Sequence, residues 1–154
     1  MYYSIKIYWV CCFIILLSFE GFGMIDSTLV PLDTIYEKVE EMPRLPGCEN
    51  TEGSIAEKKQ CADKKMLEFI YTNFKVPIVA REGGVEGVLV IRFIIDEKGK
   101  VINPQILRNI CAGCGKEGLR VVNRMNELPP WTPGKQNGKP VKVQWNLPIR
   151  ICLE

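Results

Sequence analysis

Cys111 and Cys114, in the run Cys-Ala-Gly-Cys, are the residues of this sequence whose type and spacing best suit covalent chemistry. A CxxC pair between a strand and a helix is typical of thiol–disulfide exchange, because a helix N-terminus favours the reactive thiolate. The pair here follows a predicted hairpin and no βαβ unit, so a structural disulfide or an unreactive pair is the favoured interpretation. The alternative is an exported thiol–disulfide redox protein that uses these two cysteines.

The remaining cysteines indicate structural bridging. Cys48 and Cys61 lie 13 positions apart across a turn and a helix start, and they are the favoured disulfide because the Pro- and Gly-rich segment around Cys48 has little else to hold it. With Cys152 the count after the N-terminal apolar run is odd, so at least one thiol is free or pairs between chains, and connectivity stays open. Only one CxxC and no His are present, which disfavours zinc, and we expect no metal and no cofactor.

The overall composition excludes several classes of protein. The 154 residues contain 20 Lys plus Arg and 18 Asp plus Glu, a net charge of +2, which does not indicate a nucleic-acid binder. The absence of His removes the commonest general base. Carboxylates such as Glu117 and Glu127 have no nucleophile or oxyanion site near them in the pattern, so we expect no enzyme.

The N-terminus is typical of an export signal. Lys6 precedes an apolar run from Ile7 to Phe19, Glu20 ends it, and Gly21 and Gly23 are spaced like a cleavage site. Residues 1–23 are therefore predicted to be a signal peptide, with a short membrane anchor as the alternative. Residues 24–53 are predicted to be a flexible leader, and residues 54–154 a folded domain.

Two helices and a hairpin follow. Ser54 and Glu57 have capping-box spacing at the start of a helix predicted over 54–74, which Pro77 ends, and 78–82 is expected to add one turn. Residues 85–109 predict a β-hairpin with its turn at 96–99, and Pro104 indicates a bulge or an edge in the return strand. A second helix is predicted over 116–127.

The last strand has the cleanest pattern in the chain. From Val141 to Leu153 apolar residues alternate strictly with other residues, which predicts one buried and one wet face, and Pro148 places the strand near an edge. The fold class is therefore α+β, a three-stranded antiparallel sheet with two helices packed on one face. That face should carry Phe93 and Trp145, and Trp131 is also expected in the core.

An ordered series of short motifs carries a family resemblance. The segments are Val76-Pro77-Ile78-Val79-Ala80-Arg81, Val85-Glu86-Gly87-Val88, Asp96 with Gly99, Trp131 with Pro133-Gly134-Lys135, and Gly138-Lys139-Pro140-Val141. Over about 70–153 the chain resembles the TonB C-terminal domain family, and the run 42–48 with Cys61 and Cys114 resembles its Bacteroidetes-type branch. The resemblance implies a periplasmic domain that acts in energy-coupled transmembrane transport.

The same resemblance implies a binding mode and partners. Members of the family engage outer-membrane receptors by pairing their last strand with a short receptor peptide, and some are anchored in the inner membrane beside a motor complex. The residues that would carry this role here are Lys75, Val76, Val141, Lys142, Val143, Gln144, Trp145, Asn146 and Arg150. An open strand edge supports this mode by itself, because a peptide can satisfy its backbone groups, and pairing of last strands in a homodimer is a further alternative.

Overall fold

The computed structural model describes residues 34–50 and 52–152, which belong to one compact unit. The predicted signal peptide, and the alternative of an anchor, lie outside these residues. Within the described ranges, no helix combines the length and the apolar character needed to cross a membrane.

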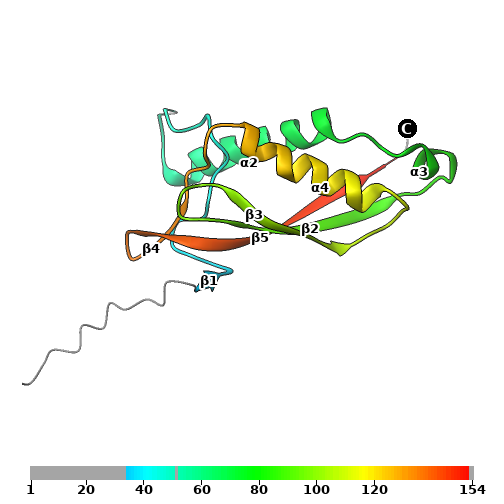
Figure 1. Cartoon of the computed structure of the whole chain (residues 1–154). Coiled ribbons are helices and arrows are strands. Elements are labelled where there is room, and N and C mark those ends of the chain that lie inside the picture. The colour runs from blue at the N-terminus through cyan, green and yellow to red at the C-terminus, as the bar shows by residue number, and fades with distance from the viewer. Residues whose placement is uncertain (1–33, 51, 153–154) are drawn as a thin grey trace, which may run out of the picture. The chain divides into compact units, whose positions relative to one another are not determined.

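The sheet is built on the predicted hairpin and the last strand (Figure 1). β2 (Gly87–Ile95) pairs antiparallel with β3 (Val101–Arg108) on one side and with β5 (Lys139–Ile151) on the other. Two short strands are added, β1 (Ile35–Tyr36), parallel to β5, and β4 (Gly134–Gln136), antiparallel to it. The strand order is β1-β5-β2-β3, and β4 pairs with β5 off this path. The sheet therefore has five strands and mixed direction, where the sequence predicted three antiparallel strands. β1 and β4 escaped prediction because they are too short to show an alternating pattern.

Helices cover one face of this sheet (Figure 1). α2 (Ile55–Asn73) begins at the predicted capping box, in which Glu57 N–H donates to Ser54 Oγ and Ser54 N–H donates to Glu57 Oε2. α4 (Cys114–Arg124) continues into a short 3-10 helix (Met125–Glu127), and α3 (Ile78–Glu82) is the predicted extra turn. A side chain at Gly118 would collide with Leu89 and Ile91, so this glycine lets α4 lie directly on β2.

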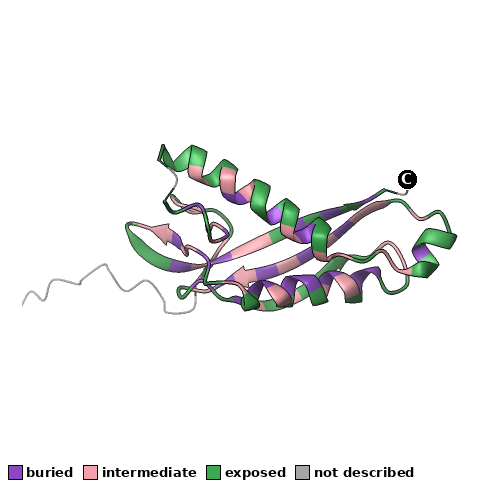
Figure 2. Cartoon of the chain, turned by 90° about the horizontal axis from the view of Figure 1, so that it is seen from above, coloured by how far each residue is buried: buried purple, intermediate pink, exposed green. Residues whose placement is uncertain are grey.

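The core lies between the helices and the sheet, and the buried residues of β2 and β5 can be followed along these strands in Figure 2. β2 alternates between fully buried and half-buried residues, and Phe93 is fully buried. Trp131 is buried and contacts both Phe93 and Trp145 edge-on, with ring centroids 6.2 and 6.0 Å away. The predicted core role of both tryptophans is confirmed, with Trp145 only partly buried.

The hairpin turn and the bulge follow local rules. Gly99 has φ +76°, and a Cβ there would strike the backbone of Trp131, whose N–H donates to Gly99 O at 3.0 Å. In β3 the register with β2 shifts next to Pro104, and Asn103 has φ +50°. Pro104 therefore marks both a bulge and, because β3 ends the strand order, an edge.

Residues 34–50, assigned from the sequence to a flexible leader, contribute to the packed domain. Leu45 belongs to the main core cluster, and Pro43 is fully buried. Cys48 forms the predicted disulfide with Cys61 of α2, which confirms that pairing. The physical reason is that this disulfide and Leu45 hold a segment whose Pro and Gly content excludes a regular element but not packing.

Candidate functional site

The candidate site is the side of β5 that faces away from β2, called here the outer edge. β2 pairs with β5 from Val143 to Ile151. On the outer edge β1 pairs only at Lys142 and Val143, through Ile35 and Tyr36. Among the described residues no strand pairs with the outer edge beyond Val143. The stretch from Gln144 to Ile151, called the open half, can therefore accept an added strand.

Pro148 and Arg150 lie within this open half. Pro148 has no N–H, so an added strand that needs a donor at this position finds none. Proline and charged side chains are residue types that limit uncontrolled pairing at sheet edges. The open half therefore favours a partner whose register tolerates the missing donor.

The predicted side chains of β5 divide between the two faces of the sheet. Val141, Val143 and Trp145 lie on the core side, and Val143 is fully buried, so these side chains anchor the strand in the core. Asn146 lies on the other face, where its Oδ1 accepts from Arg92 Nε at 3.2 Å across the β2–β5 pair. Arg150 is exposed on the same face. Lys142, Gln144 and Trp145 are half-buried, so Asn146 and Arg150 are the most exposed of the predicted contact residues on β5.

Lys75 and Val76 lie at the far end of the strand. Val76 packs against a small second core formed by Ala80, Cys114 and Ile151, so it sits beside the last residue of β5. Val141 and Arg150 are nine residues apart, about 30 Å at the rise of a strand. The structure therefore places Val76 at the Ile151 end of β5, and a peptide would have to span the whole strand to reach both Val76 and Val141.

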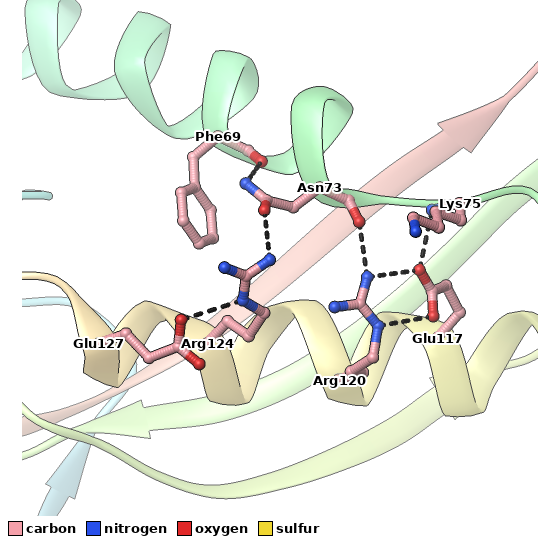
Figure 3. Close-up of polar contacts among 7 residues, drawn as sticks. All are labelled: Phe69, Asn73, Lys75, Glu117, Arg120, Arg124 and Glu127. Carbon is pink, nitrogen blue, oxygen red and sulfur yellow. Dashed lines mark hydrogen bonds and ion pairs between the residues drawn. The ribbon is translucent and has the colours of Figure 1, made fainter.

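A polar network, not predicted from the sequence, fixes the segment before Pro77 (Figure 3). Lys75 N–H donates to Glu117 Oε1 at 2.8 Å. Arg120 donates from Nε to Glu117 Oε2 at 2.8 Å and from Nη2 to the Asn73 carbonyl at 2.6 Å. The Arg120 hydrogen bond, aided by the Lys75 N–H, lowers the pKa of Glu117 below its ordinary value. The network thus holds Lys75 against α4 and leaves Glu117 ionised at neutral pH.

The same network closes the C-terminus of α2. Arg124 Nη1 donates to Asn73 Oδ1 at 2.7 Å, and Asn73 Nδ2 donates to the Phe69 carbonyl at 2.7 Å. Two guanidinium groups therefore lie where the last carbonyls of a helix carry partial negative charge, a favourable arrangement. The helical spacing of Glu117, Arg120 and Arg124 placed them on one side of α4, but nothing local indicated that this side meets α2.

The CxxC motif forms a disulfide between Cys111 and Cys114. Cys114 is fully buried in the second core, beside Ala80 and Ile151. This placement gives the bridge a structural role at the end of β5. Within residues 34–50 and 52–152, Cys152 is the free cysteine, and it is exposed.

The arrangement suits recognition by backbone pairing more than chemistry. Among the described residues, no three His, Cys, Asp or Glu side chains converge as metal ligands. What converges is an unpaired strand edge, a rigid segment at one end of it and a core that supports both. Such a site defines a small α+β domain that can add an extended segment to its sheet.

A family model identifies the family of this domain. The family model described as the C-terminal domain of the Gram-negative bacterial TonB protein matches residues 72–150, just over half of the 154 residues. The chain belongs to the TonB C-terminal domain family, as the motifs indicated. The family serves TonB-like energy transduction in transport and is not enzymatic; its domains are periplasmic and interact with outer-membrane receptors. The redox alternative is not favoured.

Two NMR solution structures of the Helicobacter pylori TonB C-terminal domain resemble the chain. The fragment of residues 179–285 is 20% identical, with a TM-score of 0.47, and the match covers 68% of this chain and 88% of that one. The fragment of residues 194–285 is 21% identical, with a TM-score of 0.46, and the match covers 59% and 92%. No curated relative matches the chain.

Proposed function

We propose that this domain binds outer-membrane receptors from the periplasm by pairing an extended receptor segment with the outer edge of β5, in energy-coupled nutrient transport. The observation that carries the proposal is the open half of β5 in a member of this family. Main-chain pairing tolerates many sequences, so one edge can serve several receptors. The contact residues are those of the strand from Val141 to Arg150, with Lys75 and Val76 at its end.

Charge supports a mildly acidic partner. Arg150 is exposed on the open half, and Lys142 precedes this half on the same strand. Rim charges of this kind change association rate and salt dependence more than affinity. A receptor segment with one or two carboxylates beside its extended stretch therefore fits this edge best.

The test uses ten-residue peptides from the periplasm-facing N-terminal segments of the bacterium's outer-membrane receptors. A binding peptide is resynthesised with N-methyl groups on alternate residues, in two complementary sets. Because the N–H groups of a strand point alternately to its two sides, strand pairing predicts that one set abolishes binding and the other does not. Equal binding by both sets would contradict strand pairing, since N-methylation leaves the side chains unchanged.

Hydrogen exchange locates the contact. Peptide binding should slow amide exchange within Gln144–Ile151 and leave β3, the opposite edge of the sheet, unchanged. Protection confined to β3 would place the partner on the opposite edge of the sheet and contradict the proposal.

A further inference from the structure

The segment 35–41 already uses part of the outer edge of β5. Ile35 and Tyr36 pair in parallel with Lys142 and Val143, and Gln144 Nε2 donates to Glu37 Oε1 at 3.3 Å. The family's proposed docking strand is therefore partly occupied by the chain itself.

The same segment is rich in acid, and its carboxylates meet polar or cationic groups. Glu40 Oε2 accepts from the Asn137 N–H at 3.0 Å, at the β4–β5 turn. Glu41 lies 3.7 Å from Lys135 Nζ, and their backbones exchange two hydrogen bonds of 3.1 and 2.9 Å. The carboxylates of this short acidic segment therefore contact β4 and the β4–β5 turn, next to the pairing of β1 with β5.

β1 makes fewer buried contacts with the domain than the residues that follow it in the chain. Ile35 is 46% exposed, Tyr36 is half-buried and Glu37 is exposed. Firm anchoring begins at Glu41, whose backbone pairs with Lys135, and continues through the buried Pro43 and Leu45 to the Cys48–Cys61 disulfide. The segment is thus tied at its base, close to its binding edge, and can leave without opening the core.

We propose that residues 35–41 are a tethered competitor, which holds the first part of the β5 edge until a partner strand displaces it. The inference rests on the proposed function for the identity of that partner. A tethered segment acts at an effective concentration in the millimolar range, so even a weak two-residue pairing competes measurably with a free peptide. The apparent affinity for a partner falls by the fraction of molecules in which the edge is free.

The test compares the full chain with the double variant Ile35→Pro, Tyr36→Pro. Neighbouring N–H groups in a strand point to opposite sides, so replacing both removes whichever one pairs with β5. The matched control is Ile35→Val, Tyr36→Phe, which keeps both donors. The probe is a fluorescein-labelled peptide with the sequence of residues 33–42, followed by fluorescence anisotropy.

The proline variant should bind this peptide about tenfold or more tightly than the wild type and the control, which keep the edge occupied. Equal binding by all three proteins would overturn the proposal. Hydrogen exchange of the wild type gives a second measurement that needs no variant. The amides paired between β1 and β5 should be protected at least roughly a hundredfold less than those between β2 and β5. Exchange of both sets only through global unfolding would also overturn it.

Receptor peptides separate this inference from the proposed function. A receptor peptide that binds the proline variant about tenfold more tightly than the wild type supports both. A receptor peptide that binds all proteins equally overturns the competition and leaves the proposed function standing. If the 33–42 peptide discriminates between the proteins and no receptor peptide binds any of them, self-occupancy is supported and receptor binding fails.

Discussion

The two halves of β5 share one buried face but differ at their outer edge. In the first half, Lys139–Val143, β1 occupies this edge at Lys142 and Val143, and β4 pairs with Lys139–Val141. The second half, from Gln144 on, has no described strand outside it and carries Pro148 and Arg150, which limit uncontrolled pairing. The difference teaches that this chain closes one part of an edge with its own backbone and protects the other part by residue type. A partner that pairs only with the second part does not compete with β1, whereas a partner that extends onto Lys142 and Val143 has to displace it.

Removing core support beneath the open half should have the largest effect. Leu147→Ala empties a position that is 1% exposed, and large-to-small core changes of this kind cost about 2–5 kcal/mol. Urea unfolding followed by circular dichroism measures the loss. Arg150→Ala, on the exposed face of the same strand, is the control and should change the free energy of unfolding by less than about 0.5 kcal/mol. A loss of that small size for Leu147→Ala would mean that β5 is not anchored there.

Removing the Cys48–Cys61 disulfide should loosen the pairing of β1 with the first half of β5 and leave the second half unchanged. Cys48→Ala with Cys61→Ala removes a bridge of sequence separation 13, which contributes up to about 3 kcal/mol through loop closure. Hydrogen exchange should then speed up at Lys142 and Val143 more than within Leu147–Ile151. A uniform change along β5 would contradict the independence of its two halves.

Removing the second disulfide tests the end of the strand. Cys111→Ala with Cys114→Ala opens a loop of separation 3, for which the same relation gives about 1.6 kcal/mol. Binding of a receptor peptide should stay within about twofold, because the bridge supports the site and does not contact the edge. An insulin-reductase activity that disappears in this variant would instead revive the redox interpretation.

The smallest effect should be a pH dependence at the segment before Pro77. Glu117 has a lowered pKa in the folded protein, so its stabilising contribution is complete above the ordinary carboxyl value of 4.5 and is lost as pH falls through the lowered value. Glu117→Gln should therefore cost up to about 1 kcal/mol at pH 7, a limit set by the exposure of Arg120, and progressively less in acid. Stability curves of both proteins between pH 7 and pH 3 measure the difference. A difference in unfolding free energy that stays the same across this pH range would show that the hydrogen-bond geometry of Glu117 matters and its charge does not.

Much of the fold followed from short-range patterns. The capping box at Ser54, the turn that ends at Gly99 and the alternation along β5 each depend on residues only a few positions apart. The pairing of Cys48 with Cys61 could also be predicted from the sequence, because both cysteines lie in one short stretch. The candidate edge itself could be located from the alternation and from the motifs of the family.

The contacts that the sequence did not reveal are all long-range. Nothing near Ile35 indicates that it pairs with a strand more than a hundred residues later, and nothing near Glu117 indicates that it accepts from the backbone of Lys75. β1 is too short for a pattern, and its formation depends on the edge that β5 presents. Likewise, Val76 and Val141 look alike as predicted contact residues, and only their places at opposite ends of β5 separate them.

By itself, the sequence determined the main helices and the three long strands, which face of β5 is buried and which family the chain belongs to. Local periodicity and capping carry that information, because they act within a few residues. Tertiary structure decided how much of the β5 edge stays open and what holds the segment before Pro77. Those outcomes depend on which distant backbone and side-chain groups are brought within hydrogen-bonding distance, and that proximity arises only when the chain has folded.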